Sequence, residues 1–385
     1  MNILLLSDFF YSFYTSLVSH LNEKGIKSSI YIASFGNSKK YNGEVAFLQL
    51  PEYGTYTSTL NKATILNYVK ENDINVILFP QISDVEDLIE EVKNINQSIA
   101  CLFLLHNRPD LVVADKREQF KRLHIKDIKS LKTFLAWGFP QFYLFIIAKL
   151  WRRWAIRQYK AFDRIVVLSS FYISEYEKVM GKKDMLSKII AIPNPKIEHT
   201  SKIAIRDKKN QIVFVGRLDR EKAIYRLLQI WIKIYKELPD WNLVIVGDGE
   251  TREEDENLTK ILGVERVKFL GYQKSIPIID ESSIICLTSN IEGLPTVFME
   301  AMTLGVIPIG FDSFSAIYDM IDNNVNGVII PAFDEELYAN ALIQLALNEN
   351  LRYHMAEMAQ QKVNQYDIEE IGKRWLYLFK ELNLL

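Results

Sequence analysis

The sequence predicts an α/β protein built from two doubly wound parallel sheets, one in each half of the chain. Short apolar runs alternate with helical stretches along its length, and this alternation is typical of parallel sheets covered by helices. A length of 385 residues suits two domains, and a hydrophobic content of 49% is enough for two cores. We therefore expect Rossmann-like domains, a class in which ligands bind at the carboxyl ends of the strands.

Each half contains five apolar runs that we expect to be strands. In the first half these are residues 3–6, 29–33, 76–79, 100–105 and 164–168. In the second half they are residues 212–215, 243–246, 267–270, 284–287 and 306–309. Pro193 and Pro195 stiffen the expected join, which continues to Lys209. The predicted domains are residues 1–195 and 196–365, followed by a C-terminal helix within residues 366–385.

Cys101 and Cys286 both lie inside apolar runs, so we expect buried thiols rather than a disulfide or a zinc site. This cysteine usage indicates a reducing, cytoplasmic setting. The first residues carry no charged leader, and we interpret them as a strand rather than a signal peptide. The net charge is −2, and no recognised nucleic-acid-binding module occurs. We therefore expect no nucleic-acid partner.

The most informative segment follows the apolar run at residues 284–287. A helix is expected to begin at Pro295, because the missing N–H of proline costs nothing in the first helical turn. The amides at such a helix start bind anions, above all phosphates. Glu292 lies in the loop before this helix, where a carboxylate can accept hydrogen bonds from sugar hydroxyls. Glu300 lies inside the helix and is suited to bind two ribose hydroxyls.

The stretch from Glu292 to Glu300, continued over residues 301–308, resembles the Glu-x7-Glu motif of glycosyltransferase family 4. Enzymes of this family use nucleotide sugars and retain the configuration of the transferred sugar. The resemblance implies the GT-B architecture, in which two Rossmann-like domains face a cleft. It also implies that the N-terminal domain binds the acceptor, that the C-terminal domain binds the donor, and that the C-terminal helix within residues 366–385 crosses back onto the N-terminal domain. The alternative is an ordinary strand–loop–helix unit with acidic residues near the helix start.

The resemblance also implies a role for each residue of this segment. Glu292 would hold the hydroxyls of the donor sugar, and Glu300 would hold the ribose. The loop and helix start between them would bind the sugar or the phosphates. The residues of this loop and helix start are Gly293, Leu294, Pro295 and Thr296.

A second element begins where the expected strand at residues 212–215 runs into Gly216. Arg217 and Lys222 follow, and together these residues resemble the Gly-Arg-Leu…Lys element of the family, whose cations face the donor diphosphate. Fixed cations stabilise the charge on a departing diphosphate more strongly in the transition state than before it. We therefore expect Arg217 and Lys222 to assist the leaving group.

Two features of this second element bear on the resemblance. Asp219 and Glu221 lie between the two cations, so a surface ion-pair cluster is the alternative interpretation. The family usually has glycine directly after the lysine, whereas this chain has Ala223.

Tyr272 follows another glycine turn, and in relatives the residues around this turn border the nucleobase. Tyr272 is therefore expected to line the base pocket, the alternative being a core aromatic. Asp248 and Glu250 flank a further turn, but a lone acidic pair of this kind is usually solvated. Because the two cations already supply positive charge, we expect no divalent metal and no cofactor besides the nucleotide-sugar donor.

His106 directly follows the run at residues 100–105, at an expected strand end. Relatives commonly have a histidine near this point that contacts the donor sugar. His106 is therefore predicted to be catalytic, with a generic loop histidine as the alternative. Many relatives also have a Gly-Gly pair after the first strand, whereas this chain has aromatic residues at positions 9–11. Backbone cannot approach a ligand as closely there, and these aromatics are candidates for an acceptor groove.

Residues 116–160 carry an unusual charge. Twelve lysines and arginines stand against two acidic residues, a balance of +10 in a chain whose net charge is −2. Lys132 and the break at residues 138–140 argue against a spanning helix. Aromatics beside arginines, as in residues 151–154, are typical of segments that rest on anionic membranes. We predict peripheral association with the inner face of the cell membrane, the alternative being a solvated helical face.

Together these features predict a retaining glycosyltransferase that moves a hexose from a nucleotide diphosphate sugar, preferentially a UDP-sugar, to a glycan or lipid-linked glycan. The expected pathway is bacterial surface polysaccharide synthesis, such as capsule or lipopolysaccharide. The family implies same-face attack, because no nucleophilic carboxylate is evident. One alternative is a nucleotide-sugar epimerase or a sugar-phosphate transferase on the same fold. The other is a non-catalytic donor-site subunit of a membrane glycosyltransferase complex.

Overall fold

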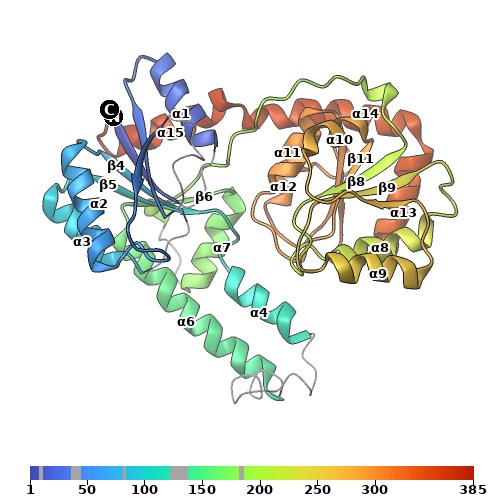
Figure 1. The fold of residues 1–385 in the computed structure, drawn as a ribbon, viewed down its shortest axis with the longest axis horizontal. Helices are drawn as coiled ribbons and strands as arrows, with labels where there is room; N and C mark the ends of the chain where they lie inside the picture. The colour runs from blue at the N-terminus through green and yellow to red at the C-terminus, as the bar shows by residue number, and fades with distance from the viewer. Residues whose placement is uncertain (8–11, 36–44, 81–83, 122–137, 182–185) are drawn as a thin grey trace. The chain divides into compact units, whose positions relative to one another are not determined.

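The computed structural model describes residues 1–7, 12–35, 45–80, 84–121, 138–181 and 186–385. The chain forms two compact units (Figure 1). The first unit comprises Met1–Pro195 together with Ile368–Leu385, and the second comprises Lys196–Asp367. Among the described residues, no helix is long and apolar enough to cross a membrane.

The first unit contains a seven-stranded sheet in which every pairing is parallel, with the order β3-β2-β1-β4-β5-β6-β7. Its strands are β1 (Asn2–Leu6), β2 (Ser29–Ser34), β3 (Ala46–Gln49), β4 (Val76–Pro80), β5 (Ala100–Leu105), β6 (Arg164–Val167) and β7 (Ile189–Ala191). All six residues of β5 are buried, as expected for a central parallel strand that is covered on both faces. The chain winds outward in both directions from β1, so a switch point lies between β1 and β4.

Helices cover this sheet. They are α1 (Ser12–Glu23), α2 (Thr59–Glu71), α3 (Glu86–Ile95), α4 (Leu111–Lys121), α6 (Pro140–Ala161), α7 (Ser170–Met180) and the C-terminal α15 (Ile368–Glu381). The long helix α6 packs against α4 and α7 (Figure 1). The last helix, α15, packs against α1, where Lys24 Nζ lies 2.8 Å from Glu369 Oε1. The last segment of the chain therefore completes the unit that the first segment begins.

The second unit contains a six-stranded parallel sheet with the order β10-β9-β8-β11-β12-β13. Its strands are β8 (Gln211–Val215), β9 (Asn242–Val246), β10 (Val267–Phe269), β11 (Ile284–Leu287), β12 (Ile307–Phe311) and β13 (Val328–Ile330). The switch point of this sheet lies between β8 and β11, because the chain winds outward from β8 on both sides. The loops that follow β8 and β11 are therefore the expected ligand-binding loops.

Helices cover both faces of the second sheet (Figure 1). They are α8 (Ile224–Ile234), α9 (Arg252–Leu262), α10 (Ser275–Glu281), α11 (Thr296–Thr303), α12 (Ile317–Met320), α13 (Glu335–Leu347) and α14 (Glu349–Lys362). Tyr338 of α13 is fully buried, and its hydroxyl donates to Ile309 O at 2.8 Å and accepts from Leu287 N at 3.3 Å. One side chain thus joins a helix to the last residue of β11 and the middle residue of β12.

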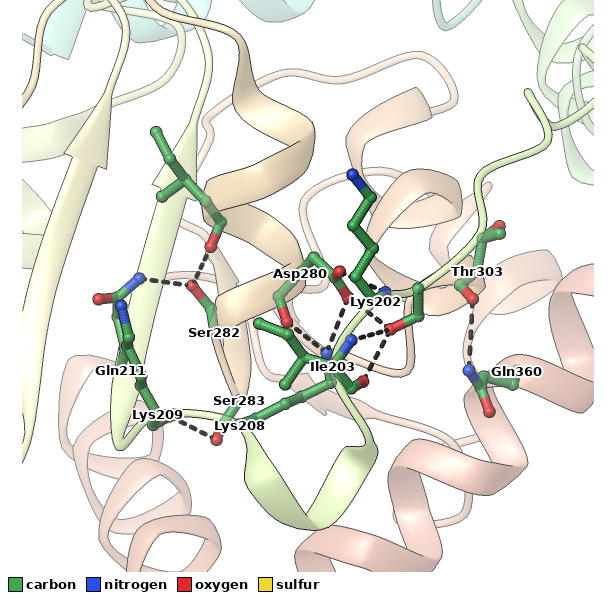
Figure 2. Close-up of polar contacts among 12 residues, drawn as sticks. Lys202, Ile203, Lys208, Lys209, Gln211, Asp280, Ser282, Ser283, Thr303 and Gln360 are labelled. Carbon is green, nitrogen blue, oxygen red and sulfur yellow. Dashed lines mark hydrogen bonds and ion pairs between the residues drawn. The ribbon is translucent and has the colours of Figure 1, made fainter.

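The segment that leads into the second unit is held against α10 by a buried ion pair. Lys208 Nζ lies 3.4 Å from Asp280 Oδ1 and donates to Asp280 O at 2.6 Å (Figure 2). Asp280 Oδ2 also accepts from Lys202 N at 2.8 Å. Burial lowers the pKa of Lys208, and the partner carboxylate opposes this shift. The polar segment that the sequence identifies as a join is therefore ordered at its C-terminal end.

Both ends of the second unit meet at Lys196. Its backbone N–H donates to Tyr366 O at 2.8 Å, and its side chain donates to Asn364 Oδ1 at 3.0 Å. The same ammonium lies 2.6 Å from Asp367 Oδ1. The first residue of this unit is thus bonded to its last turn.

The predicted fold class is confirmed, since both halves form doubly wound parallel sheets. Every predicted run is a strand, and the ends differ from the prediction by at most two residues. Three strands were not predicted, namely β3, β7 and β13, and each lies at a sheet edge. Edge strands have one neighbour and are short, so their sequence signal is weak. Cys101 and Cys286 are buried free thiols, as predicted, and burial raises both pKa values to about 12.

Candidate active site

Two glycine-containing turns lie side by side at the carboxyl ends of β8 and β9. Gly216 N donates to Val246 O at 3.0 Å, and Leu218 N donates to Asp248 O at 2.9 Å. Gly247 has a φ of +141°, and a Cβ atom placed on it would lie 1.8 Å from Gly216 O. No residue with a side chain fits at Gly247, because the two backbones touch there. The turn after β8 is therefore held in a fixed position.

A pocket of about 720 Å³ opens beside these turns. It is lined by Gly216, Arg217 and Tyr272 of the predicted site, and also by Gly247, Asp248 and the residues at the start of α10. Tyr272 is 89% exposed, so the alternative of a core aromatic is wrong. The volume lies within the usual range of small-molecule sites, about 300–1,000 Å³. An exposed aromatic ring at its wall can stack on a planar ligand group.

Arg217 projects into solvent and forms ion pairs with its sequence neighbours. Its side chain is 73% exposed, and Nη2 lies 3.1 Å from Asp219 Oδ2 and 3.4 Å from Glu221 Oε2. This is the surface cluster that the sequence offered as an alternative. Exposed pairs of this kind contribute about 0–1 kcal/mol, so Arg217 can exchange them for an anionic ligand at low cost. The geometry is compatible with either role.

Lys222 and Glu292 form a much more sheltered pair. Lys222 Nζ lies 2.5 Å from Glu292 Oε1, and the side chains are 20% and 8% exposed. Lys222 Cε also lies 3.8 Å from the position that a Cβ on Gly216 would occupy. The lysine therefore extends from the pocket wall at Gly216 to the loop after β11. Residues from the two predicted motifs, which are 70 positions apart, are thus in direct contact.

Further hydrogen bonds join the loop after β8 to the loop after β11. Asn290 N donates to Glu221 O at 2.7 Å, and Asn290 Nδ2 donates to Arg220 O at 2.9 Å. Thr288 Oγ1 donates to Lys222 O at 3.3 Å. Sequence reasoning missed Thr288 and Asn290, although an asparagine in a loop beside a motif is a recognisable turn signal. These hydrogen bonds hold the two loops together.

Arg226 is a second residue that sequence reasoning missed. It is 7% exposed, and its Nη1 donates to Thr288 O at 2.9 Å and to Asn290 Oδ1 at 3.1 Å. Its guanidinium carbon lies 4.4 Å from the ring centre of Phe333, a cation–π distance. Nothing in the sequence distinguishes this arginine from an exposed residue of helix α8. Its burial supports the loop that leads to Glu292.

Helix α11 begins at Thr296, one residue later than predicted, and Pro295 is its N-cap. No side chain caps this helix start. Gly293, Leu294 and Pro295 are buried, whereas Thr296 is exposed. Glu300 lies in the second turn and is partly buried, and burial raises its pKa. The helix dipole places positive potential at Thr296, where an anion is favoured.

Ala223 has an unusual backbone conformation. Its φ of +52° and ψ of +51° lie in the left-handed region, at the N-cap of α8. This conformation costs about 1–2 kcal/mol in residues with a Cβ atom, and glycine avoids the cost. The structure therefore gives the physical reason for the glycine that the family usually has after the lysine. Ala223 departs from this pattern and keeps its Cβ atom in the left-handed region.

His106 lies in the first unit, whereas the other predicted site residues lie in the second. It follows β5 directly, and its Nε2 lies 3.4 Å from the hydroxyl of buried Tyr14. Burial lowers the pKa of His106 to about 4, so the ring is neutral at pH 7. A neutral ring can accept or donate a hydrogen bond without carrying charge.

Asp248 and Glu250 do not converge on a common point. Asp248 Oδ2 lies 3.0 Å from Arg252 Nη1, and Glu250 lies 4.0 Å from Arg220 Nε. Within the described ranges, no three or more His, Cys, Asp or Glu side chains form a group that could hold a metal ion. The predicted acceptor aromatics at positions 9–11 lie outside the described residues.

Comparison with known proteins gives consistent similarities. The family model described as glycosyl transferases group 1 matches residues 195–362. The chain is 30% identical over 236 residues to the GalNAc-alpha-(1->4)-GalNAc-alpha-(1->3)-diNAcBac-PP-undecaprenol alpha-1,4-N-acetyl-D-galactosaminyltransferase of Campylobacter jejuni. That alignment covers 61% of this chain and 64% of the relative, so the chain spans less than two thirds of the relative's length.

Solved structures resemble the whole chain. The apo form of the lipopolysaccharide outer core galactosyltransferase WaaB matches with a TM-score of 0.69 and 17% identity, over 99% of this chain and 100% of that one. The complex of Anabaena Alr3699/HepE with UDP-glucose matches with a TM-score of 0.69 and 15% identity, over 99% of this chain and 100% of that one. These likenesses show a common two-sheet fold.

Proposed function

We propose that the protein is a retaining hexosyltransferase, because the glycosyl transferases group 1 family model matches residues 195–362 and the chain has the GT-B fold. The donor would be a nucleotide diphosphate sugar, specifically a UDP-sugar. The acceptor would be a hydroxyl of a glycan or lipid-linked glycan in bacterial surface polysaccharide synthesis. The contact between Lys222 and Glu292 carries this proposal, because it brings a cation and a carboxylate that would bind the donor sugar together beside a ligand-sized pocket.

The pocket near Tyr272 would hold the nucleotide. Its exposed ring offers a face for a nucleobase, and Gly216 lets the backbone approach the ligand. Glu300 would accept hydrogen bonds from both ribose hydroxyls. A solved structure of the same fold was obtained in complex with UDP-glucose, which supports a uridine nucleotide as the donor.

Arg217 and Lys222 would stabilise the diphosphate as it leaves. Positive charge that is already in place is worth more in the transition state, where the leaving group gains negative charge, than in the bound substrate. Glu292 would orient the donor sugar through its hydroxyls, and the start of α11 at Thr296 would face the sugar or phosphate. The acceptor hydroxyl would attack from the face that the diphosphate leaves, and a phosphate oxygen would take its proton. His106, neutral at pH 7, would hydrogen-bond the donor sugar.

The acceptor side of the proposal rests on helix α6. The similar Campylobacter enzyme acts, by its name, on a glycan attached to PP-undecaprenol. Helix α6 exposes large apolar side chains in its first half: Phe142 at 59%, Phe145 at 64%, Ile146 at 37% and Leu150 at 53%. Its second half is basic, and the helix contains no acidic residue. Such a helix suits an anionic membrane surface, so we propose that the enzyme associates with the inner face of the cell membrane.

Calorimetric titration with a panel of UDP-, GDP- and ADP-sugars in EDTA tests the donor proposal. We expect one nucleotide class to bind and the Glu300→Ala variant to lose that binding. Glu349→Ala is the matched control, because Glu349 is an acidic residue of the same unit whose side chain is 69% exposed. Binding of no sugar nucleotide, or equal binding by both variants, would contradict the proposed donor site.

Transfer to an acceptor separates the proposal from its alternatives. We expect a glycan or lipid-linked glycan to gain one hexose with the configuration of the donor retained, measured by mass spectrometry and NMR. Release of a sugar nucleotide with altered stereochemistry and no acceptor would instead indicate an epimerase. Donor binding without any chemical change, in the presence of acceptor and membrane, would indicate a non-catalytic subunit.

A further inference from the structure

An apolar groove of about 490 Å³ lies between α4 and α6 in the first unit. Every side chain that lines it is aliphatic or aromatic. Leu105 contributes from the end of β5, Val112 from α4, and Leu150 and Trp154 from α6. A site with this lining and volume can hold a hydrocarbon chain, and its side chains provide few hydrogen-bond partners for a polar ligand.

The wall on α6 is held in place by aromatic contacts. The rings of Trp151 and Trp154 stack with centroids 4.0 Å apart and an interplanar angle of 13°. Trp151 Nε1 donates to Pro109 O at 2.6 Å, and Phe103 packs edge-on against Trp154. The indole N–H of Trp151 is therefore satisfied outside the groove, and the rings present apolar surface. A groove that is already formed costs little ordering when a chain binds.

The groove connects two features described above. Leu150 lines it and is also part of the exposed apolar side of α6, with its side chain 53% exposed. At the other end, Leu105 lines the groove and His106 follows it directly. The groove is thus lined both by part of the surface that would rest on a bilayer and by the end of the strand that His106 follows.

Cations lie around the mouth of the groove. Arg153 lies one helical turn after Leu150, and Lys149 lies one turn before Arg153, so the two cations share the part of the helix surface beside Leu150. Both are exposed and, among the residues that the structure describes, neither has an acidic partner. Uncompensated cations at the mouth of an apolar slot complement a molecule that has an anionic head and a hydrocarbon tail.

We propose that this groove binds the hydrocarbon chain of a lipid phosphate, with the phosphate group facing Lys149 and Arg153. The identification of this lipid phosphate as the anchor of the acceptor rests on the proposed function. In that role, the hydrocarbon chain would leave the bilayer along α6 and enter the groove, and its headgroup would stay at the mouth beside Lys149 and Arg153. The groove would thereby select acceptors that carry a lipid.

Dodecyl phosphate below its micelle concentration is a suitable probe, because it has one chain, one phosphate and no bilayer. We expect saturable binding at one site by calorimetry. Inorganic phosphate and dodecanol, which each lack one part of the ligand, should bind at least tenfold more weakly. Val112→Trp, which fills the groove, should weaken dodecyl phosphate binding at least tenfold. Val325→Trp is the control, because the same substitution is then made at an exposed position of the second unit.

Leu150→Glu provides a second variant, which adds a negative charge at the mouth and does not fill the groove. Its site is half-exposed, so folding should tolerate the change, while a carboxylate at the mouth should repel the phosphate. Equal binding of dodecyl phosphate by the wild type, Val112→Trp and Leu150→Glu would overturn the proposal. Binding to anionic vesicles without binding to dodecyl phosphate would also overturn it, since a surface contact would then suffice.

Donor titration of the same preparations distinguishes this inference from the proposed function. If UDP-sugar binds and dodecyl phosphate does not, the lipid groove is wrong and the transferase proposal stands. If dodecyl phosphate binds in the groove and no sugar nucleotide binds, the groove is supported and the transferase proposal fails.

Discussion

Lys222 Nζ lies 2.5 Å from Glu292 Oε1, although the two residues are separated by 70 positions in the chain. Both belong to the predicted donor site, one on the loop after β8 and the other on the loop after β11. Each neutralises the other in a sheltered position, with side chains 20% and 8% exposed. The pair therefore contributes to the structure of the site as well as to its proposed chemistry, and mutation can separate the two roles.

Lys222→Met should lower the free energy of unfolding by about 3 kcal/mol, because it leaves the Glu292 carboxylate sheltered without its cation. It should also lower turnover about 100-fold, the usual effect of losing one preorganised charge at a reacting centre. The double variant Lys222→Met/Glu292→Gln should recover part of the stability and none of the turnover. Urea unfolding and a transfer assay measure both. Recovery of turnover in the double variant would contradict the proposed role of Lys222.

Arg217→Ala should lower turnover about 100-fold while changing the free energy of unfolding by less than about 0.5 kcal/mol. The reason is that Arg217 is 73% exposed and its ion pairs with Asp219 and Glu221 are screened by solvent. Arg220→Ala is the matched control, since Arg220 is 68% exposed in the same loop. If both variants lose turnover equally, the loss reflects general surface charge and not a specific role of Arg217.

Ala223→Gly should raise the free energy of unfolding by about 1 kcal/mol. Glycine relieves the left-handed strain at φ +52°, and the loss of one buried methyl group and the greater freedom of the unfolded chain offset part of the gain. Ala301→Gly is the opposite case, because Ala301 is buried in the interior of α11 with ordinary helical geometry. That variant should destabilise by about 1 kcal/mol. Thermal unfolding of the pair checks the sign of both effects.

Arg226→Met should weaken UDP-sugar binding as well as stability, because it leaves Thr288 O and Asn290 Oδ1 buried without their donor. Arg352 provides a close control. It is 5% exposed in the same unit, donates to the carbonyls of Leu345 and Ala346, and lies over the ring of Trp241. Each variant should lose about 1–3 kcal/mol of stability. Only Arg226→Met should change the dissociation constant for the donor, measured by calorimetry well below the unfolding temperature.

His106 should make stability depend on pH. Its pKa is about 4 in the folded chain against 6.5 for a free side chain. Between these values the unfolded chain binds more protons, so the stability from His106 is present above pH 6.5 and is lost as the pH falls to about 4. The full shift corresponds to about 3 kcal/mol. Urea unfolding of the wild type and His106→Gln at pH 7.5 and 4.5 measures it, and an equal loss in both proteins would contradict this origin.

The fold was predictable because its signals are local and repeated. The central strands β5 and β11 are continuous apolar runs, and their bounds agree with the prediction at every residue. Edge strands such as β13 have three residues and one neighbour, so hydrophobic periodicity cannot distinguish them from a loop. The prediction therefore identified the central strands of each sheet and missed some of the edge strands.

The candidate site was predictable where family motifs occur and was not predictable where support is purely tertiary. Arg217, Lys222, Glu292 and Glu300 belong to motifs that are visible in sequence. Arg226 reaches its partner Thr288, which lies 62 positions later in the chain, because α8 packs under the loop that contains Thr288. A contact of this kind leaves no local pattern in the sequence. The ion pair between Lys222 and Glu292 was also not predicted, because the distance between motifs depends on the strand order of the sheet.

Lys196 joins the first residue of the second unit to Tyr366 and Asp367 at its end. A segment whose two ends are already adjacent can be cut out or replaced without stretching the host chain, which is the usual condition for inserting one domain into another. Residues 196–367 are therefore a natural cassette for building chimaeras. Exchange of this cassette with that of a relative would alter the proposed donor half of the protein and leave its N-terminal and C-terminal segments packed on each other.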